Sequence, residues 1–145
     1  MSTQLEIYKT LLKHFGKQSW WPGDSVFEIC VGAILTQNTN WLNVEKALVN
    51  LKNSNILSFE SFLKIDQNHL AELIRPAGYF NIKAKRLKNF VKAIKESYDS
   101  FDELNHLSQY ELREFLFSIS GIGSETADSM LLYAFEKPVC VVDAY

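Results

Sequence analysis

ISGIGSETAD, the sequence of residues 119–128, places one glycine on each side of Ile122, between two segments whose apolar residues recur at helical spacing. Before it, Ser108 and Glu111 have the spacing of a capping box, which predicts a helix that runs up to this stretch. After it, a second helix is expected over residues 125–135. The sequence therefore predicts two helices joined by a tight glycine turn.

The glycine turn is a candidate anion site. Gly121 and Gly123 can adopt positive φ without penalty and let the backbone approach another surface closely. Amides at the start of the following helix can then point outward toward a DNA phosphate, while Ile122 anchors the turn in the core. Most glycine turns between helices are only turns, so the motif indicates function only together with others. The candidate DNA contacts are Gly121, Ile122, Gly123, Ser124 and Thr126.

The rest of the chain also has helical periodicity. A first helix is expected to end at Gly16, and the segment 26–35 is apolar nearly all round, which suggests a buried central helix. No alternating pattern predicts a strand. The fold is therefore expected to be all-α, with further helices around 44–51, 59–65, 69–74 and 82–98.

Positive charge is concentrated in one of these helices. The net charge of −2 argues against a nucleic-acid binder, but six cations and no acid occur within thirteen residues: Lys83, Lys85, Arg86, Lys88, Lys92 and Lys95. A DNA backbone responds to such local charge, so Lys83 and its neighbours are candidate DNA contacts. A solvated helix face explains the same pattern about equally well.

Composition excludes several classes of protein. Apolar residues make up 47% and aromatic residues 13% of the chain, enough for a folded core. The longest uncharged apolar run, 29–35, is too short for a membrane span, and no secretory signal is visible. Cys30 and Cys140 each lie in an apolar stretch without ligand spacing, so we expect buried thiols in the cytoplasm and no metal site.

Several short motifs occur in order along the chain and together resemble one family. They are WWP at 20–22, AILTQNT at 33–39, QNTNW at 37–41, GYFNIKA at 78–84, ISGIGSETAD at 119–128 and VVDAY at 141–145. In this combination the chain resembles the helix-hairpin-helix (HhH-GPD) DNA glycosylases of the endonuclease III superfamily. Within it, the resemblance is greatest to the branch of endonuclease III-like proteins and 3-methyladenine DNA glycosylase III.

The resemblance implies a fold, a reaction and a partner. The fold would be a six-helix barrel over 21–145 with the helix-hairpin-helix at 111–135, and the reaction would be excision of a damaged base flipped out of double-stranded DNA. The family continues past its catalytic aspartate, so the barrel is expected to be C-terminally incomplete, and the helix within 1–20 would pack with the missing helices. Complete members often carry a [4Fe–4S] cluster. Cys30 and Cys140 do not match its ligands, so no cofactor is expected in this chain, which would act as a monomer.

The resemblance gives two residues a part in base excision. Asp143 matches the family's catalytic aspartate, whose carboxylate would stabilise the positive charge that develops on the sugar. Gln37 matches the glutamine that fills the gap left by the extruded base. Without the resemblance, Asp143 could simply cap a following helix, and Gln37 could be an ordinary loop amide.

Aromatic residues in the motifs are candidates for stacking against the extruded base. Trp20, Trp21, Trp41, Tyr79 and Phe80 offer such surfaces, with Trp41 the best candidate and Trp21 the next. Core packing explains an aromatic residue equally well, so at least two of the five are expected to be structural. The base pocket is therefore expected to include Trp21, Trp41 and Tyr79.

One departure from the family pattern bears on the reaction. Bifunctional members carry a lysine in the helix after the hairpin, where this chain has Glu125. A carboxylate cannot form the imine that the lyase step needs, so the sequence favours a monofunctional glycosylase for alkylated purines, with Glu125 at the base pocket. Two alternatives stay open. One is a bifunctional glycosylase and AP lyase that acts on oxidised pyrimidines through an unrecognised lysine, and the other is a module that binds DNA without chemistry.

Overall fold

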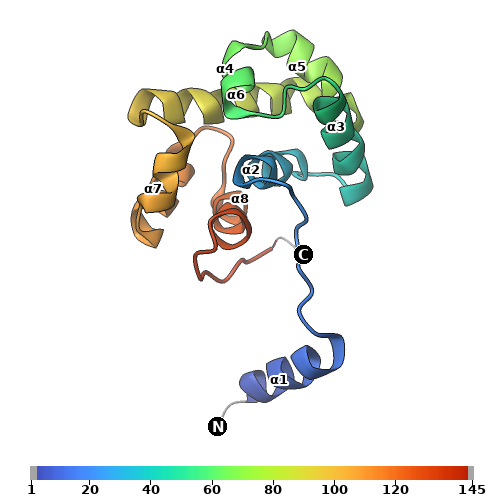
Figure 1. Ribbon diagram of the computed structural model, residues 1–145, viewed down its shortest axis with the longest axis vertical. Helices are drawn as coiled ribbons and strands as arrows, with labels where there is room; N and C mark the ends of the chain where they lie inside the picture. The colour runs from blue at the N-terminus through green and yellow to red at the C-terminus, as the bar shows by residue number, and fades with distance from the viewer. Residues whose placement is uncertain (1–2, 144–145) are drawn as a thin grey trace.

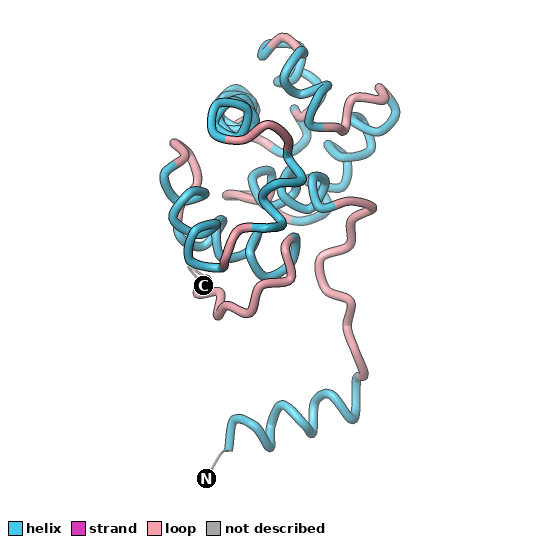
Figure 2. The backbone as a smooth tube through the Cα atoms, turned by 60° about the vertical axis from the view of Figure 1, so that its left-hand side comes forward, coloured by secondary structure: helices cyan, strands magenta, loops and turns pink. Residues whose placement is uncertain are grey.

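The computed structural model describes residues 3–143. It consists of a helical body and a first helix, α1 (Thr3–Phe15), that stands away from the body at the end of an extended segment (Figure 1). A second view shows the same separation (Figure 2). No strand occurs within 3–143, so the predicted all-α fold is confirmed. Residues 1–2 and the last two residues of the VVDAY motif lie outside the described range.

The helices of the body follow one another through short connections. First come α2 (Val26–Leu35), α3 (Trp41–Asn53), α4 (Phe59–Lys64), α5 (Gln67–Leu73) and a 3-10 turn, η1 (Arg75–Ala77). After them come α6 (Phe80–Ser97), a second 3-10 segment, η2 (Phe101–His106), α7 (Gln109–Ser118), α8 (Ser124–Ser129) and the π-helical η3 (Met130–Ala134). The helices expected from the apolar pattern are present, with ends shifted by up to three residues.

α2 lies at the centre of the body, as its apolar sequence predicts. Ser25 caps its start by accepting a hydrogen bond from the amide of Glu28 at 3.1 Å. Most residues of α2 are buried, and the helix contacts α3, α6, α8 and η3. Because each large apolar side chain contributes about 1.5–3 kcal/mol when buried, α2 is the main support of the elements around it.

Phenylalanine rings form the core beside α2. The ring of Phe27 meets those of Phe62, Phe90 and Phe101 at centroid distances of 5.2, 6.5 and 5.4 Å. Such aromatic pairs add about 0.5–1.5 kcal/mol each beyond burial alone. The cluster therefore joins α2, α4, α6 and η2 into one unit.

α7 and α8 form the predicted hairpin. Ser108 and Glu111 make both hydrogen bonds of the capping box at the start of α7. Arg113 on α7 donates to the carboxylate of Asp128 on α8 at 2.7 and 3.2 Å, which ties the two helices together. After Ser129 the second helix changes from α to π geometry, a wider turn than the periodicity predicts.

The apolar side chains of α1 are exposed. α1 has no buried residue, and Tyr8 and Phe15 are exposed at 59% and 62%. Cys140 is also exposed whereas Cys30 is buried, so the expectation of two buried thiols is wrong for Cys140. It lies in the irregular segment after η3. No helix within the described residues is long and apolar enough to cross a membrane.

Candidate active site

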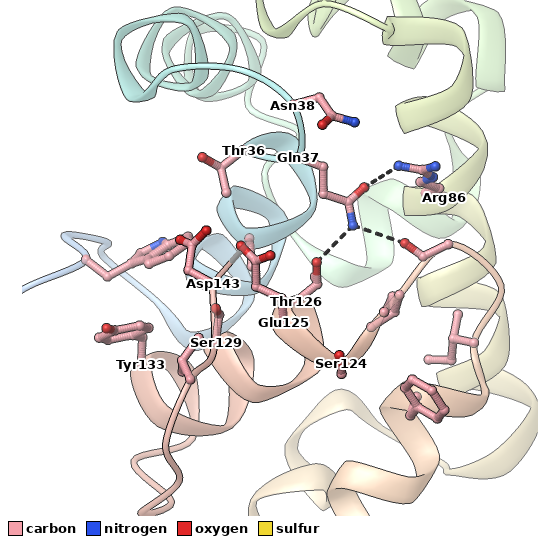
Figure 3. Close-up of a pocket in the computed structure, with 18 of the residues that line it drawn as sticks. Thr36, Gln37, Asn38, Arg86, Ser124, Glu125, Thr126, Ser129, Tyr133 and Asp143 are labelled. Atoms are coloured by element: carbon pink, nitrogen blue, oxygen red, sulfur yellow. Dashed lines mark hydrogen bonds between the residues drawn. The ribbon is translucent and has the colours of Figure 1, made fainter. Parts of the chain in front are cut away.

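A cleft of about 1210 Å³ opens where the hairpin meets the loop after α2. Its walls come from the WWP segment, the loop at 36–39, the turn and first residues of α8, and residues 141 and 143 (Figure 3). Five of the six sequence motifs therefore contribute residues here, although the WWP segment, the segment 33–41, the hairpin and the VVDAY segment are separated in the chain. GYFNIKA at 78–84 contributes no residue to the cleft wall.

The cleft brings two carboxylates together. Asp143 lies on the irregular segment after η3, Glu125 lies in the first turn of α8, and both are exposed residues of the cleft wall. Figure 3 shows both on the side of the cleft that α8 and the last segment form. These are the two acids that the sequence singled out, and the structure places them in one site.

α8 and η3 contribute two cleft residues that sequence reasoning missed. Ser129 and Tyr133 follow Glu125 at intervals of four residues, so all three line the cleft from one side of the same helix. That spacing is the signal in the sequence that could have identified them. Together they extend the wall from the carboxylates to the aromatic rings (Figure 3).

Trp21 is packed against two aromatic rings in the cleft. Its indole stacks on Tyr133 at a centroid distance of 5.3 Å and an angle of 27°, and it meets Trp41 edge-on at 5.6 Å. Gly32 makes room for it, since a Cβ atom there would lie 3.2 Å from Nε1 of Trp21. That buried indole N–H has no hydrogen-bond partner among the described residues, so ring packing holds Trp21 in place.

Gln37 links the loop after α2 to the hairpin through three hydrogen bonds. Its Nε2 donates to the carbonyl of Gly121 and to Oγ1 of Thr126, both at 3.0 Å. Its Oε1 accepts a hydrogen bond from the guanidinium of Arg86 on α6. The dashed lines in Figure 3 mark all three. Thr126 is therefore buried with its hydroxyl engaged by Gln37, and does not face outward as the prediction of a DNA contact requires.

The two glycines of the hairpin turn differ. Gly121 has a φ of +98°, and a Cβ atom there would lie 2.3 Å from Cγ of Arg86. Gly123 has a φ of −85° and nothing within 4 Å of the place of a Cβ atom, so it does not use the freedom of glycine to adopt positive φ. It begins α8 in an extended conformation and leaves open space beside the exposed Ser124. Ile122 is 4% exposed and anchors the turn in the core, as predicted.

Lys83 is buried rather than exposed. It is 1% exposed, and its ammonium donates to the carbonyls of Leu35 at 2.8 Å and Ala77 at 2.7 Å. Burial and the nearby Arg86 lower the pKa of Lys83 to about 8. The prediction of a DNA contact at Lys83 is wrong, because the residue lies on the inward face of α6 and binds the carbonyls at the ends of α2 and η1.

Lys88 on the same helix also points inward. Its ammonium donates to the carbonyls of Phe62, Leu63 and Ile65 at 2.7, 3.1 and 2.8 Å, at the end of α4, where a helix leaves carbonyls unpaired. Burial lowers the pKa of Lys88. The basic helix is thus partly an internal support, and its exposed cations are Lys85, Lys92 and Lys95.

Tyr79 and Phe80 lie outside the cleft wall. Tyr79 is 65% exposed, because positive φ values at Gly78 and Tyr79 turn the chain outward at the start of α6. Phe80 packs on the core below the guanidinium of Arg75, which lies 4.6 Å from its ring centroid. The structure therefore does not bring Tyr79 together with Trp20, Trp21 and Trp41, which line the cleft.

The cleft wall is acidic apart from one guanidinium. Its charged residues are Glu125, Asp143 and Arg86, and Arg86 donates to Gln37. Carboxylates without a matching number of cations favour a neutral or cationic ligand. Within the described residues, no three His, Cys, Asp or Glu side chains are grouped so as to hold a metal ion.

Comparison with known proteins gives one consistent family. The family described as HhH-GPD superfamily base excision DNA repair protein matches residues 31–145. A Methanocaldococcus jannaschii protein named as a DNA repair glycosylase is 51% identical over 142 residues, which are 97% of this chain and 64% of that protein. Endonuclease III of Sulfolobus acidocaldarius is 32% identical over 123 residues, which are 83% of this chain and 53% of that protein. The chain thus spans between half and two thirds of the length of these relatives.

A solved structure shares the fold. The crystal structure of H. pylori 3-methyladenine DNA glycosylase (MagIII) bound to 1,N6-ethenoadenine matches with a TM-score of 0.83 and 39% sequence identity. The match covers 96% of this chain and 66% of that chain.

Proposed function

Since this chain belongs to the HhH-GPD superfamily of base excision DNA repair proteins, we propose that it acts as a monofunctional DNA glycosylase on a damaged base flipped out of double-stranded DNA. One observation supports this above all. A single cleft combines Asp143, Glu125 and the rings of Trp21 and Trp41 beside the hairpin turn. A glycosylase needs a charge that stabilises the reacting sugar and a surface that holds the base, and this cleft offers both.

The extruded base would stack against the aromatic wall. Leaving the duplex costs the base a few kcal/mol in lost stacking and pairing. Stacking on Trp21 or Trp41 returns about 1–3 kcal/mol, because every base presents a π face. Both rings line the cleft, and the contact of Trp21 with Tyr133 fixes its plane before a base arrives.

Asp143 would act at the sugar. Cleavage of the N-glycosidic bond develops positive charge on the sugar, and a carboxylate close to it lowers the energy of that transition state. The electron pair of the breaking bond leaves with the base, and a water molecule oriented by Asp143 adds to the sugar and loses a proton. The position of Asp143 in the cleft wall supports this assignment.

The lyase step would lack its nucleophile. An imine with the sugar needs an uncharged amine at the cleft, and the wall contains no lysine among the described residues. Lys83 is buried with its ammonium hydrogen-bonded to two carbonyls. The resemblance to the family places Glu125 at the position where bifunctional members carry lysine. These observations favour base release without strand cleavage.

The preferred substrate would be an alkylated purine. Alkylation at a ring nitrogen makes the base cationic, and a cation is attracted both to aromatic faces and to carboxylates. Trp21 and Trp41 supply the aromatic faces, and Glu125 supplies the carboxylate. No lysine among the described residues of the cleft wall offsets the negative charge of Glu125. The related 3-methyladenine glycosylase structure, bound to a modified adenine, is consistent with this class of base.

A bifunctional enzyme is the second candidate. A relative at 32% identity is named endonuclease III, from Sulfolobus acidocaldarius. For this reason the second candidate is a glycosylase with AP lyase activity that acts on oxidised pyrimidines. Such an enzyme would have to bring a lysine into the cleft that the described residues do not place there.

The DNA backbone would meet the hairpin turn and the exposed face of α6. Open space lies beside Gly123 at the start of α8, and a phosphate would bind there. We further propose that the protein works as a monomer in the cytoplasm. The chain's own cysteines do not fit a [4Fe–4S] cluster, because Cys30 is buried inside α2 and only Cys140 is exposed.

The test is base release from DNA that contains 3-methyladenine, using the protein as its complete gene encodes it. Released base and strand breaks are scored separately, with borohydride present to trap an imine. Free base from an intact strand is expected. A trapped adduct with a nicked strand would establish the bifunctional candidate instead, and DNA binding with neither signal would leave a different lesion or a non-catalytic module.

Asp143→Asn separates the enzyme from a module that only binds DNA. The substitution keeps the size of the side chain and removes its charge, so base release is expected to fall at least about a hundredfold while DNA affinity stays within about twofold. Single-turnover base release and fluorescence anisotropy with labelled duplex measure the two quantities. An unchanged rate would rule out Asp143 as the catalytic carboxylate.

A further inference from the structure

Arg86 contacts two segments of the cleft wall, the loop after α2 and the hairpin turn. It projects from α6, is partly buried, and lines the cleft wall. Its guanidinium donates to Oε1 of Gln37, as Figure 3 shows. Its methylene groups cover Gly121, where even a single added carbon would lie 2.3 Å from Cγ of Arg86. One side chain therefore touches both the loop after α2 and the hairpin turn.

The chemistry of Arg86 fixes the orientation of the Gln37 amide. A guanidinium has only donors, so the group that faces it must be the amide oxygen. The NH₂ group of Gln37 then has to face the hairpin, where the carbonyl of Gly121 and the hydroxyl of Thr126 lie at 3.0 Å. If the amide were reversed, its NH₂ group would face the guanidinium and its oxygen would face the Gly121 carbonyl, which cannot donate. All the polar atoms of the Gln37 side chain are thus committed to one arrangement.

Asn89 and Lys83, also on α6, bind the same two segments of the chain. Asn89 donates from Nδ2 to the carbonyl of Ser120 at 3.3 Å, one residue before the glycine that Arg86 covers. Lys83, one turn before Arg86, binds the carbonyl of Leu35 at the end of α2. The same helix thus fixes the start of the Gln37 loop, the amide of Gln37 and the hairpin turn.

We propose that Arg86 is a positioning residue that holds Gln37 and the hairpin turn in one geometry before DNA binds. This inference rests on the proposed glycosylase function, because Gln37 matters to base excision only if a base leaves the duplex beside it. The guanidinium of Arg86 is engaged by the side chain of Gln37. It acts through Gln37, so its loss is expected to change base release only in a protein that still has Gln37.

Hydrogen exchange of the Gln37 side-chain amide tests the arrangement without any reaction. In the wild-type protein these protons are expected to exchange at least about tenfold more slowly than those of exposed glutamines. Arg86→Met keeps an apolar chain over Gly121 and removes the donor, and it should abolish that protection. Lys85→Met is the matched control, since it removes an exposed charge from the next position of α6 and should leave protection unchanged. Equal protection in Arg86→Met and the wild type would overturn the proposal.

A double-mutant cycle tests the consequence for the reaction. Single-turnover base release is measured for Arg86→Met, Gln37→Ala and the combination. Each single variant is expected to release base about tenfold more slowly, and the combination no more slowly than Gln37→Ala alone. Additive losses would overturn the proposal, because they would mean that Arg86 acts on DNA independently of Gln37.

Two further observations keep the outcomes distinct. If the wild-type protein binds DNA but releases no base, the proposed function fails, and the exchange measurement still decides the role of Arg86. If Arg86→Met does not fold, Arg86→Lys replaces it. Lysine still donates to the Gln37 oxygen but lacks the guanidinium plane, so protection should return in part, and its complete absence in a folded Arg86→Lys variant counts against the proposal.

Discussion

Gly121 and Gly123 stand two positions apart in the hairpin turn, yet the same substitution should affect them differently. Gly121→Ala meets both a φ of +98° and the side chain of Arg86, so it is expected to lower the free energy of unfolding by about 2 kcal/mol or more. Gly123→Ala meets neither and should change stability by less than about 1 kcal/mol. Urea denaturation followed by circular dichroism measures both, and equal losses would contradict the geometry described for the turn.

Lys83 should give the protein a distinctive dependence of stability on pH. Its pKa is about 8 in the folded chain against an ordinary 10.5, so between these values the unfolded chain binds more protons. The free energy of unfolding should therefore rise with pH across that window, by roughly 2 kcal/mol from this residue. The measurement compares urea denaturation of the wild type and Lys83→Met from pH 7.5 to 10.5. The free energy of unfolding of the wild type should rise with pH relative to that of the variant. If the two proteins showed the same dependence on pH, the lowered pKa of Lys83 would be refuted.

The residues of the cleft show what could and could not be predicted. The resemblance to the HhH-GPD glycosylases placed Asp143, Glu125, Trp21 and Trp41 at a site, and the structure brings all four to one cleft. Lys83 could not be assigned correctly, because its partners are carbonyls up to 48 positions away and a carbonyl has no signature in the sequence. The inward position of a lysine depends on the three-dimensional packing of α6 and not on its composition.

Among the helices, α6 combines an apolar inner face with lysines whose ammonium groups bind carbonyls at the ends of other helices. Lys88→Met removes the donor from three carbonyls at the end of α4, so the variant is expected to lose about 2 kcal/mol of stability. Lys85→Met is the control and should change stability by less than about 0.5 kcal/mol, since its side chain is exposed. Thermal denaturation of both variants gives the comparison. If the two variants had similar melting temperatures, the three carbonyls would form hydrogen bonds to other groups without loss of stability.

At the same scale, most helices follow from local rules. Apolar spacing and the caps at Ser25 and Ser108 act within a few residues, so α2, α7 and their neighbours could be predicted to within a turn. The change to π geometry after Ser129 could not, because no residue type in this segment distinguishes a π turn from an α turn.

For the whole molecule, α1 and the body are expected to be independent in this chain. No residue of α1 is buried, so a chain that lacks residues 1–15 should unfold at the same urea concentration, within about 0.5 kcal/mol of the parent in free energy. The predicted packing of α1 on further C-terminal helices is a separate prediction, which the same deletion tests in a longer protein. A large loss of stability in the present chain would show that α1 packs on the body in solution.

The wide turn of η3 also has a genetic consequence. The amide of Phe135 donates to the carbonyl of Met130, five residues back, so this turn contains one residue more than an α-helical turn. A deletion of one codon within 130–134 would let the helix close in the ordinary way and draw the following segment back by one position. Asp143 would then leave its place in the cleft while still being encoded. In surveys of natural variants, such in-frame deletions should therefore be as rare as substitutions of Asp143 itself.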